Sequence, residues 1–317
     1  MTNEMAQKPS VLVMMATYNG EKYVAEQIDS ILAQEGVNVT LLISDDGSSD
    51  NTPSICKRYA ENKPNVQFSV NEKNKGLSKN FMDMLYGIDP ASYDYYAFSD
   101  QDDYWLSDKL SHAIGSIFAA GNGPHLYYSD VCNVNEKLDG GTSEFAPFGP
   151  YSNSFGLLLT VNWASGCTMV FNSEFAFVLQ RYEPSSWSRN HDCWVHLVAR
   201  ALNAQIADLD HAFIKRRISG QNQVGDRGLN RLSPQRVRII LGSLFAPSDH
   251  GLTETASLLL DGYGDSMSDE DRELAARFVS GRHSLIKRLG MMFDPAFAQP
   301  FPLEDVMFKG KMLLNVY

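Results

Sequence analysis

Short apolar runs that alternate with amphipathic stretches constrain the fold of this chain more than any other feature. The segments VLVMMA (11–16) and TLLIS (40–44) are typical of strands buried on both faces. Between them, apolar residues recur at the spacing of one helical face, at Val24, Ile28, Ile31 and Leu32. Further strands are predicted at 66–70 and over YYAFSD (95–100). Helices are predicted through about residue 59, near residues 78–88 and from about residue 107 onward. This alternation predicts βαβ units and an α/β fold with a mainly parallel central sheet flanked by helices.

Length and charge narrow the class of protein. A chain of 317 residues is long enough for one large domain or for one domain with an appendage. Its formal net charge of −11 argues against nucleic acid as a general partner. Any anionic substrate must therefore be held by a local cation or by a local cluster of basic residues.

Cysteine usage and the amino terminus indicate the compartment. The four cysteines are far apart and form no CxxC pair, which is typical of reduced, buried thiols in a cytosolic protein. The first ten residues are polar, with no apolar signal segment, and no run reaches transmembrane length. We expect a cytoplasmic protein.

The acidic segment SDQDDYW (99–105) follows the last of these strands. In an extended chain, side chains two residues apart point the same way, so Asp100 and Asp102 would converge on one hard cation. Proteins commonly hold Mg²⁺ or Mn²⁺ through one or two carboxylates and let substrate phosphates complete the shell. The alternative is an acidic loop that caps the helix expected from Ser107. An EF-hand fits poorly, because Tyr104 and Trp105 stand where an oxygen ligand and a glycine are required.

Polar clusters follow three of the predicted strands: ATYNG, SDDGSSD and SDQDD. Ligands of open α/β sheets bind beyond the carboxyl ends of the strands. The chain has neither the GxGxxG turn of dinucleotide dehydrogenases nor the GxxxxGK[ST] loop of P-loop enzymes. The remaining expectation is a phosphate-bearing ligand that a metal ion bridges to the protein.

Four motifs carry a resemblance to a known family: ATYNGEKYVAEQIDSILAQ, LLISDDGSSDNT, NKGLSKNF and SDQDDYWLSDKL. In order, spacing and strand context they resemble the amino-terminal half of a family-2 glycosyltransferase with the GT-A fold. The segments SGCTMVFN (165–172) and HDCWV (191–195) are similar to the subgroup that includes bacterial rhamnosyltransferases. The resemblance covers about Val11 to Gly225. It implies a catalytic domain at 1–228, with a nucleotide half at 9–104 and an acceptor half at 105–228, and a mainly helical extension at 229–317.

The resemblance implies the following donor site. Residues at the ends of the first two strands hold the base and ribose: Ala16, Thr17, Tyr18, Asp45 and Asp46. A carboxylate can accept the imide N–H of uracil or thymine, and an aromatic ring can stack on the base. Asn74 and Gly76 match an NxG turn, Asp100 and Asp102 match the DxD metal site with Asp103 assisting, and Gln101 contacts the donor. Helix capping by the Asp45–Asp46 pair and plain turn chemistry at 74–76 are the alternatives.

Asp192 matches the general base of the family. An inverting transferase needs a base to take the proton from the acceptor hydroxyl, and this step contributes about 10²–10⁴-fold. A carboxylate at a helix amino terminus is also stabilised there, so helix capping is the competing interpretation. His191 and His196 are five residues apart and not on one helical face, so they predict no zinc pair.

Basic residues follow this motif. The segment around Arg217, Gly220 and Asn222 resembles the family's pattern but has Ser219 where a histidine is expected. Lys215, Arg216 and Arg217 are predicted to close over the diphosphate, since guanidinium pairs well with phosphate oxygens. A solvated basic strand end is the alternative.

The last part of the chain is basic and apolar. From Ala275 onward it has six Lys or Arg and three Asp or Glu, and an apolar tail begins near Phe301. Such a segment suits an anionic membrane surface. It also suits packing on the catalytic domain or on a second protomer in a homodimer. We favour packing.

The resemblance thus implies an inverting, Mg²⁺- or Mn²⁺-dependent transferase. The leading donor is dTDP-rhamnose and the runner-up is a UDP-hexose. The expected acceptor is a hydroxyl of a growing surface polysaccharide or of a lipid-linked glycan at the inner face of the plasma membrane. A non-catalytic nucleotide-sugar-binding protein is the alternative of another class. A sugar-phosphate nucleotidyltransferase is disfavoured, because TYNGEKY is not a glycine-rich, basic phosphate loop.

Overall fold

The computed structural model describes residues 7–144, 154–218 and 250–317. The chain divides into two compact units, each assembled from three segments. The first contains Met1–Phe145, Ala164–Arg181 and Ala204–Gly220, and the second contains Ala146–Trp163, Tyr182–Asn203 and Gln221–Tyr317. The domain boundary predicted at residue 228 lies outside the described residues and stays a prediction.

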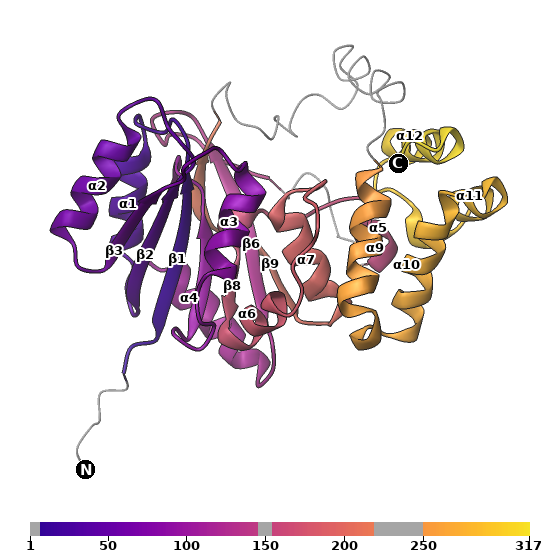
Figure 1. Cartoon of the computed structure of the whole chain (residues 1–317), viewed down its shortest axis with the longest axis horizontal. Helices are drawn as coiled ribbons and strands as arrows, with labels where there is room; N and C mark the ends of the chain where they lie inside the picture. Colours follow the sequence, from indigo (N-terminus) through magenta and orange to yellow (C-terminus); the bar gives the residue numbers. More distant parts are fainter. Residues whose placement is uncertain (1–6, 145–153, 219–249) are drawn as a thin grey trace. The chain divides into compact units, whose positions relative to one another are not determined.

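The first unit is built on one sheet. Its described strands lie in the order β3-β2-β1-β4-β8-β6-β9-β5, with β7 paired to β6 (Figure 1). Four strands are mutually parallel: β1 (Ser10–Thr17), β2 (Asn38–Asp45), β3 (Val66–Val70) and β4 (Tyr95–Ser99). They are connected by α1 (Val24–Leu32), α2 (Thr52–Asn62) and α3 (Leu77–Tyr86). The predicted βαβ units and the α/β fold class are therefore confirmed.

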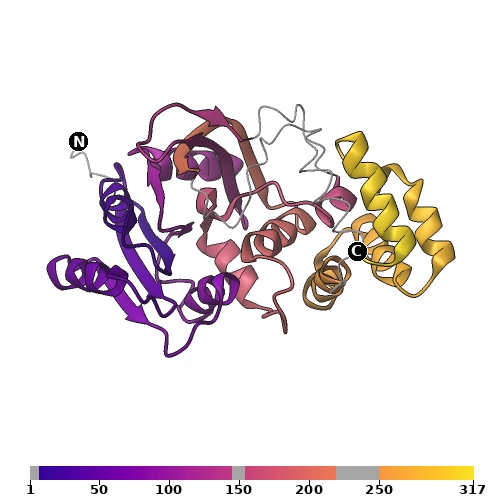
Figure 2. The ribbon, with the colours of Figure 1, turned by 90° about the horizontal axis from the view of Figure 1, so that it is seen from above.

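Strand order decides which face each of these helices covers. The chain moves outward from β1 through β2 to β3 and then crosses back to β4. Because crossover connections are right-handed, connections that run in opposite directions along the sheet place their helices on opposite faces. Accordingly, α1 contacts α2, whereas α3 contacts α6 (Ser173–Gln180). Figure 2 shows α1 and α2 on one side of the parallel strands and α3 on the other.

The remainder of the sheet is mixed. β8 is antiparallel to β4 and β6, β9 is parallel to β6, and β5 is antiparallel to β9. These strands are β5 (Asp103–Trp105), β6 (Leu126–Val134), β7 (Thr142–Ser143), β8 (Val170–Asn172) and β9 (Gln205–Arg217). α4 (Lys109–Ala120) follows β5, and the 3₁₀ turn η2 (Gly166–Thr168) precedes β8.

Apolar burial fixes the positions of β1 and α1. The residues of β1 from Val11 to Met15 are at most 2% exposed. Ile28 and Ile31 of α1 pack into the same core cluster as Val11 and Val13. Full burial of such a side chain stabilises the fold by about 1.5–3 kcal/mol. Since β1 lies between β2 and β4, this core also holds the strands on both of its sides.

The parallel strands end together at one edge of the sheet. Thr17 lies opposite Asp45 in the register of β1 and β2, and Met15 lies opposite Ser99 in the register of β1 and β4. The loops that follow these three strands therefore begin side by side, which is where open α/β sheets bind ligands.

The second unit is helical in its described part. Its elements are α5 (Phe155–Leu158), α7 (His191–Ala201), α9 (Gly251–Tyr263), η3 (Gly264–Ser266), α10 (Asp269–Gly281), α11 (Leu285–Met292), η4 (Pro295–Phe297) and α12 (Pro302–Leu314). The ring of Trp194 on α7 packs against Tyr182 and Tyr263, at centroid distances of 6.1 and 6.0 Å. The predicted helix at HDCWV and the helical character of residues 250–317 are confirmed.

The tail is only partly buried. Phe308 and Met312 of α12 are buried, and the Tyr317 ring meets Phe278 at 5.2 Å. Val306 and Leu314 are more than half exposed. Among the described helices, none has the length and apolar character needed to span a bilayer.

Candidate active site

Asp45 ties the loop after β2 to the end of β1. Its side chain is fully buried. Oδ2 accepts hydrogen bonds from Thr17 Oγ1 at 2.8 Å and from Ser48 Oγ at 2.6 Å, and Oδ1 accepts from the N–H groups of Gly47 and Ser48 at 3.1 and 2.8 Å. These bonds use the roughly four acceptor positions of a carboxylate. Asp45 thus shapes the predicted base-binding loop from inside, and its direct contact with a base stays a prediction.

Asp46 organises the turn that contains Asn74 and Gly76. Its carboxylate accepts from Asn71 Nδ2 at 3.0 Å and from the N–H groups of Lys75 and Gly76, both at 2.8 Å. Asn74 Nδ2 donates to the Asp46 carbonyl at 3.0 Å. Gly76 has φ +81°, a conformation that favours glycine. Asp46 accepts fewer protein hydrogen bonds than Asp45 and so has more capacity for an additional donor.

Gln101 joins the end of β1 to the acidic segment. Its Oε1 accepts from the Tyr18 N–H and its Nε2 donates to the Tyr18 carbonyl, both at 2.9 Å. The Tyr18 side chain is 51% exposed and therefore accessible to a ligand. Gly20 permits the close approach, because a Cβ at this position would lie 2.1 Å from Gln101 Oε1. Ala16 is buried in β1, one residue before this loop.

Asp100 and Asp103 come together beyond the end of β4. One carboxylate oxygen of each and the Cys167 Sγ atom lie within 4.8 Å of one another. Asp102 is not a member of this group. Residues 101 and 102 form a bend between β4 and β5, so the assumption of an extended chain, which made Asp100 and Asp102 point the same way, was wrong. Metal binding by all three aspartates stays a prediction.

The Asp100–Asp103 pair fits a hard cation. Asp103 is 1% exposed, and its Oδ2 atom has no hydrogen-bond partner among the described residues. Burial raises the pKa of the Asp103 carboxyl to about 6, while nearby Arg216 opposes the rise and Asp102 adds to it. An unsatisfied buried oxygen beside a second carboxylate suits Mg²⁺ or Mn²⁺, which prefer oxygen ligands. Cys167, whose thiol pKa burial raises, lines the group as a soft sulfur atom that such ions do not select.

The basic end of β9 is drawn into the protein. The Arg217 guanidinium donates to the Asp102 carbonyl at 2.9 Å and to the Glu136 carbonyl at 3.2 Å, and it pairs with Glu26. It also lies 4.5 Å from the centre of the Tyr23 ring. At 2% exposure, Arg217 holds the acidic segment in place, and the predicted contact with a diphosphate stays a prediction.

The other basic residues of this segment differ in their surroundings. Arg216 pairs with Glu144 and donates to Cys167 Sγ at 3.3 Å, whereas Lys215 is partly exposed. Ser219, Gly220 and Asn222, which resemble the family's lid pattern, lie outside the described residues.

Asp192 lies in the first turn of α7, in the second unit. Asn190 occupies the N-cap position, and Asp192 Oδ1 accepts from the Cys193 N–H at 2.7 Å. Its carboxylate is partly exposed and sits where the helix dipole stabilises an anion. This environment suits an ionised base, and the catalytic role of Asp192 stays a prediction.

Sequence reasoning missed two contributions to the site. Cys167 lies beside Asp100 and Asp103 although it is more than sixty residues away in the chain, and the only signal was its place in the SGCTMVFN segment. Glu26 and Tyr23 contact Arg217 from the start of α1. Their i, i+3 spacing puts them on one helical face, but nothing in the sequence identifies Arg217 as their partner.

Comparison with known proteins gives the family. The profile described as "Glycosyl transferase family 2" matches residues 12–175. The chain is 32% identical over 184 residues to dTDP-rhamnosyl transferase RfbG of Shigella flexneri, which covers 57% of this chain and 62% of that protein. It is 38% identical over 110 residues to the putative glycosyltransferase EpsE of Bacillus subtilis, covering 34% and 38%. The chain thus spans less than two thirds of the length of either relative.

Two solved structures share the fold. TarS residues 1–349 of S. aureus in complex with UDP-GlcNAc has a TM-score of 0.53 at 18% identity, covering 96% of this chain and 90% of that one. The mannosyltransferase PcManGT of Pyrobaculum calidifontis, in complex with GDP-Man and Mn²⁺, has a TM-score of 0.51 at 16% identity, covering 98% and 86%. The fold is therefore GT-A, as the resemblance implied. With its parallel half, its acidic segment after β4 and a family profile over more than half its length, the chain belongs to glycosyltransferase family 2.

Proposed function

We propose that this glycosyltransferase is an inverting, divalent-cation-dependent enzyme. It moves a sugar from a nucleoside diphosphate to a hydroxyl of a growing surface polysaccharide or of a lipid-linked glycan. The observation that carries this proposal is the Asp100–Asp103 pair, with its unsatisfied buried oxygen, at the edge where β1, β2 and β4 end. A bound Mg²⁺ or Mn²⁺ ion would neutralise charge on the departing diphosphate.

The donor is assigned from a relative. The 32% identity to a dTDP-rhamnosyl transferase makes dTDP-rhamnose the leading donor. A UDP-hexose is the alternative, since TarS, which shares the fold, binds UDP-GlcNAc. Thymine and uracil present the same imide N–H, so the acceptor capacity of Asp46 and the exposed ring of Tyr18 suit both bases.

Asp192 is the base that we assign to the acceptor hydroxyl. Its carboxylate would take the hydroxyl proton as that oxygen attacks the anomeric carbon and the bond from this carbon to the diphosphate oxygen breaks. Attack on the face opposite the leaving group inverts the anomeric configuration. The partial exposure of Asp192 leaves it accessible to an acceptor.

The sequence suggested membrane contact for the apolar tail from about Phe301, but Phe308 and Met312 of this tail are buried, so we propose the contact for α11 instead. Ile286 of α11 and Phe293, which follows this helix, are both 82% exposed, and Lys287 and Arg282 close to them in the chain are also exposed. Exposed apolar groups next to basic residues suit an anionic lipid surface, even in a chain of net charge −11. A lipid-linked acceptor would be met there, at the inner face of the plasma membrane.

Donor binding tests the cation site. Calorimetric titration of the wild type with dTDP and UDP should give tighter binding with Mn²⁺ than in chelator. Asp100→Asn should lose this difference, because it removes a ligand charge from the pair. Asp108→Asn is the control, since Asp108 is exposed at the N-cap of α4. Equal affinity with and without Mn²⁺ in the wild type would overturn the cation dependence.

Sugar transfer tests Asp192. Asp192→Asn should keep donor affinity, while turnover falls by about 10²–10⁴-fold, the usual contribution of a general base. Asp269→Asn is the matched control, because Asp269 is also in the first turn of a helix of the second unit. NMR of the wild-type product should show the anomeric configuration inverted relative to the donor. Near-normal transfer by a folded Asp192→Asn variant removes Asp192 from the mechanism, and a retained configuration refutes inversion.

A further inference from the structure

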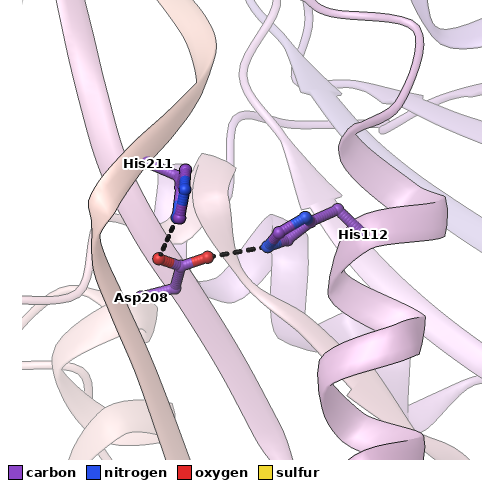
Figure 3. A group of neighbouring side chains, drawn as sticks. All are labelled: His112, Asp208 and His211. Carbon is purple, nitrogen blue, oxygen red and sulfur yellow. Dashed lines mark hydrogen bonds and ion pairs between the residues drawn. The ribbon is translucent and has the colours of Figure 1, made fainter.

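A second group of metal-ligating side chains lies in the first unit and shares no residue with the acidic pair. His112, Asp208 and His211 each offer one ligand atom, and these atoms lie within 4.8 Å of one another. Figure 3 shows both imidazole rings turned toward the carboxylate. His112 Nε2 lies 2.8 Å from Asp208 Oδ2, and His211 Nδ1 lies 2.7 Å from Asp208 Oδ1.

A bulge in β9 creates this group. In the pairing of β6 with β9, Ser129 lies opposite Asp208, but the next residue, Asp130, lies opposite Ala212. Three residues of β9 are therefore looped out of the ladder, and His211 is one of them. A regular strand would separate residues 208 and 211 by about 10 Å, on opposite faces. The bulge instead brings them to hydrogen-bond distance, and re-aiming a side chain is a recurrent use of bulges near sites.

Neighbouring groups hold the ligand atoms in place. Tyr127 OH donates to Asp208 Oδ2 at 2.9 Å, which fixes the carboxylate from its protein side. The His112 ring packs on Phe213 at a centroid distance of 4.4 Å, and His211 stacks on the same ring at 6.1 Å. Such outer partners orient the ligands of protein metal sites.

The donor set selects a class of ion. Two imidazole nitrogens and one carboxylate oxygen suit Zn²⁺ and related transition ions, whereas Mg²⁺ prefers oxygen alone. Bonds of about 2.0–2.2 Å in a tetrahedral arrangement place ligand atoms about 3.3 Å apart. The present N···O distances of 2.8 and 2.7 Å need only a small opening to reach this. His211 is 59% exposed at its side chain, so water can supply a fourth ligand.

We propose that His112, Asp208 and His211 form a transition-metal site, distinct from the catalytic cation site, that takes Zn²⁺. The ion would cross-link α4 to the bulge of β9, the strand whose carboxyl end carries Arg216 and Arg217. Its role is to stabilise the first unit, and its chemistry is separate from sugar transfer.

Zinc titration of the metal-stripped full chain tests the site, with Mn²⁺ present to fill the oxygen-ligand site. The wild type should bind one equivalent of Zn²⁺ and melt at a higher temperature with it, since binding to the native state stabilises by mass action. Bound Co²⁺ should give visible absorption bands of a four-coordinate ion. His211→Ala should weaken Zn²⁺ binding by more than 100-fold, because losing an outer partner alone costs about 10–100-fold.

Two further variants sharpen the result. Tyr127→Phe keeps the ring but removes the hydrogen bond to Asp208, so Zn²⁺ affinity should fall by about 10–100-fold. His283→Ala, an exposed histidine of the second unit, should bind as the wild type does. His211 is exposed, so its replacement is expected to fold. Unchanged Zn²⁺ affinity and stoichiometry in His211→Ala, or no Zn²⁺ binding by the wild type, would show that the group is a hydrogen-bonded clasp and not a metal site.

Discussion

At the scale of single residues, the proposed donor site depends on one close approach that glycine permits. Gly20 has no Cβ where Gln101 passes, and Gln101 in turn fixes both backbone groups of Tyr18. Because Gly20 leaves room for it, the Gln101 side chain can connect the loop after β1 to the acidic segment that follows β4.

Gly20→Ala should weaken donor binding. The added Cβ would lie 2.1 Å from Gln101 Oε1, so the amide must move and its two hydrogen bonds to Tyr18 are lost. At about 1 kcal/mol for each bond, nucleotide affinity or stability should fall by about 2 kcal/mol in total. Gly115→Ala in α4 is the control, because nothing lies within 4 Å of its Cβ and alanine favours a helix. Calorimetry measures the nucleotide affinity of both variants, and denaturant unfolding measures their stability. If Gly20→Ala matches Gly115→Ala in both, the hydrogen bonds of Gln101 do not support the donor site.

His191 should make stability depend on pH. Burial lowers its pKa to about 4, although nearby Asp192 opposes this, and the ordinary value is 6.5. The folded state thus binds the proton of His191 less well than the unfolded state does. The free energy of unfolding is therefore undiminished by this group above pH 6.5 and decreases as the pH falls toward 4. At about 1.36 kcal/mol per pKa unit, the loss over this window is about 3 kcal/mol.

Urea unfolding of the wild type and of His191→Gln at several pH values between 7.5 and 4.5 measures this contribution. Glutamine does not titrate, so the variant should lose less stability than the wild type as the pH falls. Parallel curves for the two proteins would show that His191 does not titrate differently on folding.

At the scale of elements, the end of β9 fixes the acidic segment. Arg217 reaches from β9 to carbonyl groups of Asp102 and Glu136 and to the carboxylate of Glu26 on α1. Buried arginine supplies several donors in a planar fork, and this geometry explains why one side chain can join three segments.

Arg217→Ala should therefore destabilise the protein by about 2–3 kcal/mol, because the partly buried carbonyl groups of Asp102 and Glu136 lose their donor and the pair with the half-exposed Glu26 is lost. Lys215→Ala, two residues earlier on the same strand and partly exposed, should change stability by less than about 0.5 kcal/mol. Arg217→Lys should recover only part of the loss. Denaturant midpoints of the three variants provide the measurement, and a neutral Arg217→Ala would mean that other contacts hold the segment.

At the scale of the whole molecule, charge and apolar exposure are unevenly distributed. The chain is acidic overall, yet Ile286 and Lys287 of α11 and Phe293 directly after it are exposed. The buried Phe308, Met312 and Tyr317 show that part of the tail belongs to the core of the second unit, whereas its packing on the catalytic domain or on a second protomer stays a prediction. The exposed residues of α11 are where we propose the contact with a membrane.

Replacing Ile286 and Phe293 together by glutamate should abolish association with vesicles that contain phosphatidylglycerol, since it removes the apolar contact and reverses the local charge. The melting temperature should stay unchanged, because both side chains are 82% exposed. Phe118→Glu is the control, as Phe118 is also 82% exposed but lies on α4 of the first unit. Vesicle sedimentation by the double variant at wild-type levels would exclude α11 as the contact.

The amino-acid sequence by itself determined the elements and the family. Continuous apolar runs are typical of strands that are buried on both faces, and this local property predicted β1 and β2, because it can be recognised within one short segment. The same segments carry the motifs that resemble family 2, and the family profile confirms that resemblance over residues 12–175.

The tertiary structure alone decided which distant residues meet. The mixed strand order brings β8 and β9 beside β4 and β6, and so places Cys167 against Asp100 and Asp103 and Arg217 against the Asp102 carbonyl. A bend interrupts the chain at residues 101–102, and the bulge in β9 joins His211 to Asp208. Periodicity reports which side of an element is buried, but not which other element covers it. Contacts between segments far apart in the chain follow from strand order and local irregularities, which no short stretch of sequence encodes.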